Sequence, residues 1–348
     1  MSDEDPLYAS NIKDFFLDNV YGRLPCFEDV NVSYVPLKET NDPIKGTLSR
    51  EIEVRLERKG LSASFPFLLL LPNNPKGVFV FICNRKANDK EESKLPDAAT
   101  SFFPGESIAS RGYGAASFLT EEIAEDKKGF RHGLNRLFPD ISHKEGNSYG
   151  TLALWAKGVS LLIDYLREDS ATSSLPLASL GHSRGGKASL LAGVLDQRID
   201  LAIASCAGKG GDAEESNLHE GAETIKLITR RFPYWFAPNY KRYGKIRMPF
   251  RQSEFLSLLC PRLLYTSSKS LDLWADPISE YETLLEVSES YEERGANGLY
   301  AKGNFEIGRE MISLEGNIGH HHLHGAHSLN ELDWRLYMDF WDCKLRKK

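Results

Sequence analysis

Hydrophobic and polar positions change their spacing several times along the 348-residue chain. Apolar residues three or four apart predict a helix over 11–20. Alternation over 49–58 and a continuous apolar run over 65–71 predict two strands, with a turn at 60–62 between them. A shorter strand is predicted at 30–35. These N-terminal patterns indicate the antiparallel start of a mixed sheet.

From residue 78 onward, short apolar runs alternate with helical patterns. The strands are predicted at 78–82, 112–118, 177–180, 201–204, 262–267 and 310–314. The helices are predicted at 108–111, 150–167, 187–195, 254–259, 281–291 and 332–345. Such alternation is typical of a doubly wound, mostly parallel sheet. We therefore predict an α/β fold in which helices cover both faces of the sheet, as a three-layer sandwich.

Composition narrows the possible functions. The net charge is −6 and no block of lysine and arginine stands out, which argues against nucleic acid as a partner. The five cysteines are scattered and odd in number, which favours free thiols. No apolar run approaches the roughly 20 residues that a membrane span needs. The acidic N-terminus has no signal-peptide pattern, so we expect a cytoplasmic protein, or a secreted one if a signal peptide has been removed.

One motif carries candidate chemistry. Residues 181–185 read Gly-His-Ser-Arg-Gly, between a predicted strand and a predicted helix. This context is typical of the nucleophile elbow of an α/β-hydrolase, where a serine is held exposed above a parallel sheet. Ser183 is then the candidate nucleophile. The alternative is a glycine-rich loop without chemistry.

A serine nucleophile needs a histidine base and an acid that orients it, which in this fold follow in the order serine, acid, histidine. Five histidines lie in the predicted loop before the closing helix, and we select His327, which stands just before that helix. A metal site in this cluster is less favoured, because no carboxylate or cysteine set frames it at ligand spacing. Asp272 and Asp276 both follow the strand at 262–267. Asp272 is preferred, since Asp276 before Pro277 can simply cap the next helix.

Further residues are candidates for binding. The loop after the strand at 78–82 usually donates an oxyanion N–H in this fold, so we expect Asn84 near the site. An ordinary polar loop is the alternative. Residues 212–250 are rich in aromatic and basic side chains, and we predict an insertion that presents them to a sugar or acidic substrate beside the active site. A purely packed lid is the alternative.

Several segments together resemble the glucuronoyl esterases, a family of α/β-hydrolases that act on carbohydrates. Residues 181–187 are similar to the family's Gly-Cys-Ser-Arg-x-Gly-Lys motif. Agreement continues at 149–158, 208–211, 260–262, 272–277 and 325–327, so the resemblance extends from about residue 78 to the C-terminus. It implies cleavage of esters of 4-O-methyl-glucuronic acid, with Ser183 as nucleophile and His327 as base. Arg184 would hold the oxyanion, and Lys187 and Trp274 would contact the uronate sugar.

At two positions of the family's motifs this chain has a different residue. Cys206 stands where the family often has the acidic Glu, so the acid is expected to be Asp272. His182 replaces the motif's cysteine and either brings a second imidazole to the site or fills space. Members that act on plant cell walls are normally exported, and the lack of a visible signal favours a divergent esterase acting on smaller uronate esters.

The sequence thus predicts a serine carboxylic-ester hydrolase that needs no metal or other cofactor and has a uronate ester as its partner. We expect one α/β-hydrolase domain over 1–348, with a helical extension at 1–27 and the insertion at 212–250. Two alternatives remain: an esterase of the same fold acting on acetylated sugars, and a catalytically weak sugar-binding homologue.

Overall fold

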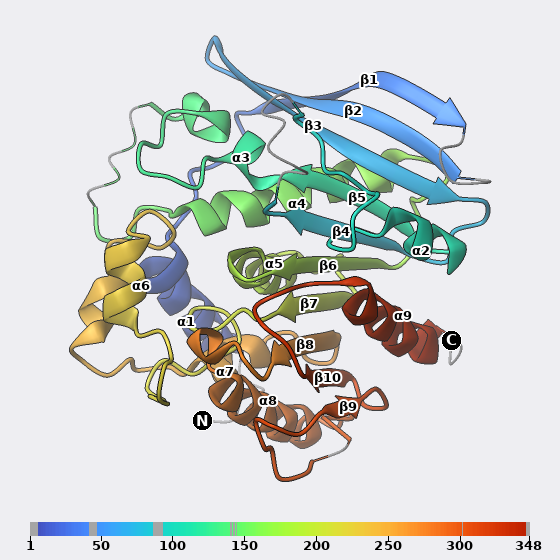
Figure 1. Cartoon of the computed structure of the whole chain (residues 1–348). Coiled ribbons are helices and arrows are strands. Elements are labelled where there is room, and N and C mark those ends of the chain that lie inside the picture. Colours follow the sequence, from blue (N-terminus) through green and yellow to red (C-terminus); the bar gives the residue numbers. More distant parts are fainter. Residues whose placement is uncertain are drawn as a thin grey trace.

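The computed structural model describes residues 6–41, 47–85, 93–139, 141, 143, 145–300 and 302–345. Within them, a ten-stranded sheet runs through the molecule in the order β1-β2-β3-β5-β4-β6-β7-β8-β10-β9. Figure 1 shows β1 to β3 at one end of this sheet and β8 to β10 at the other. Strands β1 to β3 pair antiparallel. The next six in sheet order, β5, β4, β6, β7, β8 and β10, pair parallel, which confirms the predicted α/β-hydrolase fold class.

The strands have the following bounds: β1 Asn31–Asn41, β2 Thr47–Arg58, β3 Leu61–Pro72, β4 Val78–Cys83, β5 Gly114–Leu119, β6 Leu177–His182, β7 Leu201–Ser205, β8 Leu263–Lys269, β9 Met311–Ser313 and β10 Ile318–Leu323. The α-helices are α1 Pro6–Phe16, α2 Gly105–Ser110, α3 Thr120–Ile123, α4 Thr151–Glu168, α5 Arg184–Leu195, α6 Ile225–Arg231, α7 Gln252–Ser257, α8 Pro277–Glu293 and α9 Glu331–Leu345. The predicted helix over 11–20 is α1 continued by a π-helical turn, Leu17–Tyr21.

Strand β4 explains why helices cover both faces of the sheet. All six of its residues are buried. Val80 and Ile82 pack in the cluster that includes α4 and α5. Phe79 and Phe81 point the other way, into the cluster that includes α2 and α9. Since successive side chains of a strand face opposite sides, a continuous apolar strand needs a helical layer on each side.

The sheet also determines where a site can form. Chain order reverses at β4, because β5 lies on one side of it and β6 on the other. In open α/β sheets, crevices for ligands form at the carboxyl ends of the strands beside such a reversal. Ser183 follows the carboxyl end of β6, so the candidate nucleophile lies at this point.

The prediction for the last strand was wrong. Residues 310–314 contribute only β9, a short antiparallel edge strand. The last parallel strand is β10, whose three histidines suggested a loop because they are polar. Burial is possible because ring nitrogens find partners in the register with β8: His320 Nδ1 lies 2.9 Å from the hydroxyl of Thr266. His322 Nδ1 likewise lies 2.7 Å from a hydroxyl, that of Ser268.

His321 faces the opposite side of β10 and joins a different network. Its Nε2 lies 2.9 Å from Asp333 Oδ1, on helix α9. Lys269 pairs with the same carboxylate. The predicted histidine loop therefore divides into a buried structural strand and a short loop that contains His324 and His327.

In the described part of the chain, no helix is both long enough and apolar enough to cross a membrane.

The buried histidines predict an acid-sensitive fold. Burial holds the pKa of His320 well below its usual range. Below about pH 6.5 the unfolded chain binds a proton here that the folded chain does not, so folding stability falls by up to about 1.4 kcal/mol per pH unit.

His320→Asn keeps a polar group beside Thr266 and removes this titration. We expect its unfolding free energy, measured by urea denaturation, to fall less steeply from about pH 7 to 5 than in the parent. His132→Asn, at an exposed histidine, is the control and keeps the parental slope. Equal slopes in the two variants would contradict the prediction.

Candidate active site

Strand β6 turns directly into helix α5 at Ser183. Ser183 has φ 57° and ψ −126°, a conformation that non-glycine residues rarely adopt and that costs energy to hold. The turn is tight, since a Cβ on Gly181 would lie 2.1 Å from the carbonyl oxygen of Gly185. The Ser183 N–H donates to the carbonyl oxygen of Ser205 at 2.7 Å, which anchors the turn on β7. These are the features of a nucleophile elbow.

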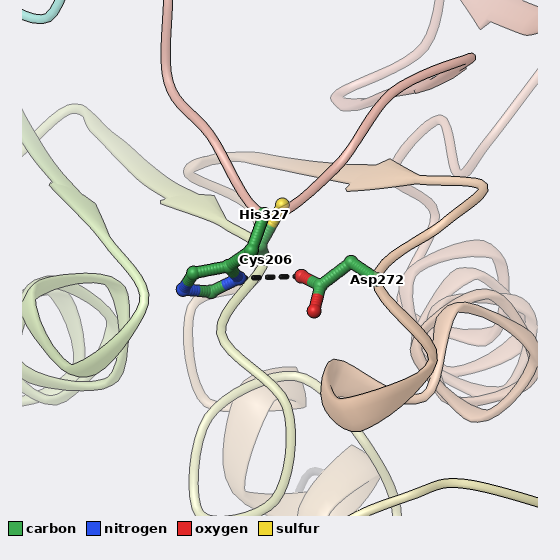
Figure 2. Close-up of side chains that lie close together, drawn as sticks. All are labelled: Cys206, Asp272 and His327. Carbon is green, nitrogen blue, oxygen red and sulfur yellow. Dashed lines mark hydrogen bonds and ion pairs between the residues drawn. The ribbon is translucent and has the colours of Figure 1, made fainter.

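The structure brings His327 and Asp272 together. His327 Nδ1 lies 2.5 Å from Asp272 Oδ2. Figure 2 shows the two side chains facing each other across this contact. Asp272 follows β8 and is buried, whereas the His327 side chain is 39% exposed. A buried carboxylate beside one ring nitrogen fixes the orientation of the imidazole and leaves Nε2 for other chemistry.

Asp276, the alternative acid, has different partners. Its Oδ1 accepts from the Ser279 N–H at 3.2 Å and caps helix α8, with Pro277 in the first turn. Its carboxylate also lies 3.3 Å from the Lys209 ammonium and 2.7 Å from His219 Nδ1. Asp276 thus caps helix α8, the structural role that the sequence offered for it.

His182 places a second imidazole beside the first. Its ring centre lies 4.5 Å from that of His327, with the planes tilted by 43°. Nδ1 lies 3.1 Å from the Ser205 hydroxyl, and the buried Nε2 has no partner among the described residues. Burial, with the charge of His327 next, holds the pKa of His182 well below its usual range. The ring is therefore neutral and packs against one side of His327.

Cys206 lies at the end of β7 in a strained conformation, with φ 50°. Its N–H donates to the carbonyl oxygen of Ser267 at 2.7 Å, and the side chain is buried. Burial raises the pKa of this thiol well above its usual range. The position that the resemblance gives to an acid therefore holds a neutral thiol beside Asp272 and His327 (Figure 2).

A cavity of about 210 Å³ lies beside Ser183, Cys206 and His327. Its lining combines the elbow, the histidine and cysteine, charged groups and aromatic rings: Ser183, Arg184, Lys187, Cys206, Ala207, Glu223, Arg231, Phe232, Trp235, Trp274, Ala275 and His327. The candidate nucleophile, the candidate base and three of the proposed binding residues, Arg184, Lys187 and Trp274, therefore share one cavity. Asn84 is not in this lining. Its side-chain amide donates to the carbonyl oxygen of His182 at 3.1 Å and so contacts the elbow from the end of β4.

Lys187 is more deeply embedded than a sugar-binding lysine needs to be. Its side chain is 3% exposed, and its ammonium donates to the carbonyl oxygens of Ala207 and Lys209, both at 2.5 Å. A third bond goes to Glu223 Oε1 at 2.9 Å. The three donors of the ammonium are therefore engaged. Its contact with a sugar stays a prediction, and Glu223 is the carboxylate that it holds at the cavity wall.

Arg184 is held by a residue that the sequence did not single out. Its Nε lies 2.6 Å from Asp126 Oδ2, and the other oxygen of Asp126 accepts from the Trp235 indole N–H at 2.6 Å. One carboxylate thus fixes both an arginine and an aromatic ring of the cavity. Asp126 and Glu223 were missed because ion pairs between distant segments leave no local pattern. Of these pairs the sequence singled out Lys187 as a sugar contact and Arg184 as an oxyanion donor, and the anion that each one pairs with is seen only in the structure.

One part of the predicted insertion lines the cavity, and another part is packed inside the protein. Phe232 and Trp235 stack with ring centres 3.8 Å apart and line the cavity. Arg231 lies over the Trp274 ring, 5.7 Å from its centre. Other rings of the segment pack inside, such as Tyr240, whose hydroxyl donates to Glu215. The segment thus supplies a cavity wall at 231–235 and packed structure further on, and its contact with a sugar or acidic substrate stays a prediction.

The sheet, the strained elbow and the loops at the carboxyl ends of the parallel strands together define an α/β-hydrolase. The family model for fungal glucuronyl esterases matches residues 87–295. The chain belongs to this glucuronyl esterase family.

Relatives in sequence agree with this assignment. A carbohydrate esterase of an unknown prokaryotic organism is 33% identical over 241 residues, which covers 68% of this chain and 55% of that protein. The 4-O-methyl-glucuronoyl methylesterase of Podospora anserina is 27% identical over 197 residues, or 53% of this chain and 40% of that protein. The chain thus spans about half the length of these relatives.

Solved structures agree over nearly the whole chain. A promiscuous CE15 esterase from a marine bacterial metagenome has a TM-score of 0.84 at 25% identity and covers 97% of this chain and 91% of that one. The glucuronoyl esterase from Solibacter usitatus has the same TM-score at 26% identity and covers 97% and 92%.

Breaking the buried pair of Lys187 and Glu223 is predicted to lower the free energy of unfolding by a large, measurable amount. Lys187→Met leaves the Glu223 carboxylate buried without its cation, and breaking one partner of such a pair costs about 3–5 kcal/mol. The double variant Lys187→Met/Glu223→Gln removes that charge, so we expect it to be more stable than Lys187→Met alone. Unfolding free energies from urea denaturation measure both.

The surface pair of Lys302 and Glu292 is the control for this measurement, because both side chains are well exposed. Lys302→Met is expected to cost no more than about 1 kcal/mol. If Lys187→Met and Lys302→Met lower the free energy of unfolding by similar amounts, this prediction is contradicted.

Proposed function

We propose that this chain is a carboxylic-ester hydrolase that cleaves esters of glucuronic acid, of its 4-O-methyl form, or of a related uronate. The observation that carries the proposal is the contact of 2.5 Å between His327 and Asp272, at the cavity that Ser183 also lines. Family membership supports the substrate class, since the Podospora anserina relative is a 4-O-methyl-glucuronoyl methylesterase.

The first half of the reaction transfers the acyl group to the serine. Ser183 Oγ attacks the ester carbonyl while His327 accepts the hydroxyl proton at Nε2. Asp272 stabilises the resulting imidazolium through Nδ1. The C–O bond to the alcohol then breaks, and His327 returns the proton to the leaving oxygen. Water attacks the acyl-enzyme with His327 as base again, which releases the uronic acid and restores Ser183.

The oxyanion of each tetrahedral intermediate needs donors near the elbow. The N–H of Arg184 is the first of helix α5, and free N–H groups at a helix N-terminus stabilise negative charge. The guanidinium of Arg184, held by Asp126, lies at the same cavity. Asn84, which binds the elbow from β4, is proposed to lie near the second donor.

The cavity wall suits a sugar that carries a carboxyl-derived group. Trp274 is 36% exposed and offers a ring face to the apolar side of a pyranose. Glu223 presents a carboxylate that accepts from sugar hydroxyls, and Lys187 holds it there. Arg231, between Trp274 and Phe232, adds a cation at the rim. These groups favour an acidic-sugar ester over a simple acetate.

A substrate panel tests this function. We expect the purified protein to hydrolyse the methyl ester of 4-O-methyl-glucuronic acid with a higher kcat/KM than acetylated xylo-oligosaccharides. Ser183→Ala removes the nucleophile, so turnover is expected to fall by about 10⁶-fold. Circular dichroism checks that this variant is folded.

The alternatives give distinct results on the same panel. Faster turnover of acetylated sugars would make the chain an acetyl esterase. Uronate binding by calorimetry without hydrolysis of any ester would make it a sugar-binding protein. Undiminished activity of folded Ser183→Ala would refute the serine mechanism.

The acid is tested separately. Asp272→Asn keeps the shape of the side chain and removes the charge beside His327, so kcat is expected to fall by about 10⁴-fold with little change in stability. Asp276→Asn instead weakens the ion pair with Lys209, so its main effect is expected on the urea midpoint. The reverse pattern would show that Asp276 is the acid.

A further inference from the structure

Three chemically different side chains meet behind the cavity. Cys206 follows β7, Asp272 follows β8 and His327 follows β10, and these strands are neighbours in the sheet. One ligand atom from each, a sulfur, an oxygen and a nitrogen, all lie within 4.8 Å of one another. Figure 2 shows the three side chains gathered at one point. Cys206 and His327 also line the cavity, which gives a small ion a path to them.

The donor set selects one class of ligand. Thiolate, imidazole and carboxylate are the ligands of Zn²⁺, and soft thiolates favour Zn²⁺-like ions over Mg²⁺ and Ca²⁺. A tetrahedral ion with ordinary Zn–S, Zn–N and Zn–O bonds holds its donors about 3.3–3.6 Å apart. Since all the ligand atoms lie within 4.8 Å, the widest pair must close by at most about 1.5 Å, and the His327–Asp272 contact must open by about 1 Å. Side-chain rotation of this size needs no change of the sheet.

The electrostatic surroundings favour a cation. The carboxylate of Asp272 lies beside the thiol, whereas burial raises the pKa of Glu280 well above its usual range, so Glu280 adds no charge at neutral pH. Lys269, which acts on it as a positive charge, is already paired with Asp333. A divalent ion would be neutralised by one carboxylate and one thiolate, with the imidazole as neutral ligand.

We propose that Cys206, Asp272 and His327 form an inhibitory site for a thiophilic divalent cation, with Zn²⁺ and Cd²⁺ as the defining ions. Binding releases one proton to solvent, from the Cys206 thiol, and the neutral His327 imidazole changes tautomer, so that Nδ1 loses its proton and Nε2 takes one up. It forms metal–sulfur, metal–nitrogen and metal–oxygen bonds, and nothing is oxidised or reduced. The ion takes the place of the proton between His327 and Asp272, so the imidazole can no longer form a stabilised imidazolium. The inhibitory part of this inference rests on the proposed esterase function.

Cadmium binding tests the site without reference to activity. The protein is used without a histidine tag, with the exposed thiols removed by Cys26→Ser and Cys343→Ser. Titration with CdCl₂ is expected to give a thiolate-to-cadmium charge-transfer band in the ultraviolet. Cys206→Ser should abolish it. Cys83→Ser is the matched control, because Cys83 is also a buried thiol at the carboxyl end of a strand, and it should keep the band.

Inhibition is then measured on the same variants, with each rate expressed as a fraction of that variant's own rate without metal. ZnCl₂ should inhibit ester hydrolysis reversibly, with activity restored by EDTA. Cys206→Ser is expected to raise the half-inhibitory concentration more than about tenfold, since even losing an outer-sphere partner weakens metal binding 10–100-fold. Cys83→Ser should leave it unchanged.

Each outcome separates the two proposals. A cadmium band that needs Cys206, in a protein without esterase activity, supports the metal site and refutes the proposed function. An active esterase that resists Zn²⁺ and shows the same band in Cys206→Ser overturns the metal site. If Cys206→Ser does not fold, His327→Gln takes its place, and zinc calorimetry must then show weakened binding. Unchanged binding in His327→Gln overturns the proposal.

Discussion

The contact of backbone with backbone at the elbow is the constraint on which the site depends. Gly181 lies against Gly185 so closely that no side chain fits between them, and α5 therefore begins directly beside the end of β6. This closeness forces Ser183 into a strained conformation and aims the first N–H groups of α5 at the cavity. One turn later, it brings Lys187 beneath the loop after β7, where carbonyl oxygens and Glu223 meet its ammonium.

The opposite wall of the cavity depends on the pairing of β8 with β10. Hydroxyl groups of β8 lie in register with the histidines of β10, which lets a polar sequence form a buried strand. The end of β10 then leads into the loop of His327, while the end of β8 leads to Asp272. The contact between the two side chains therefore follows from strand register rather than from any motif around either residue.

This difference explains what the sequence could predict. The elbow is local: its glycines, the strand before it and the helix after it lie within twenty residues, so the pattern was sufficient. The choice of Asp272 as the candidate acid rested on chain order and on its place after a strand, and the structure places it beside His327. Strand β10 was missed because a histidine run appears polar unless its hydroxyl partners, more than fifty residues away, are known. Asp126 and Glu223 were missed for the same reason, since each acts through a partner in another segment.

The proposed position of the acid follows from the same sheet. Strands β7, β8 and β10 are neighbours, so a residue after β7 and a residue after β8 can both reach the His327 imidazole. Only one carboxylate is needed there, and a second would add an unpaired buried anion beside Asp272 at a cost of several kcal/mol. Asp272 already lies against His327, and Cys206 fills the other position with a group that burial keeps neutral. The thiol is therefore compatible with a working site, and because it is also a soft ligand, the same substitution makes that site open to metal ions.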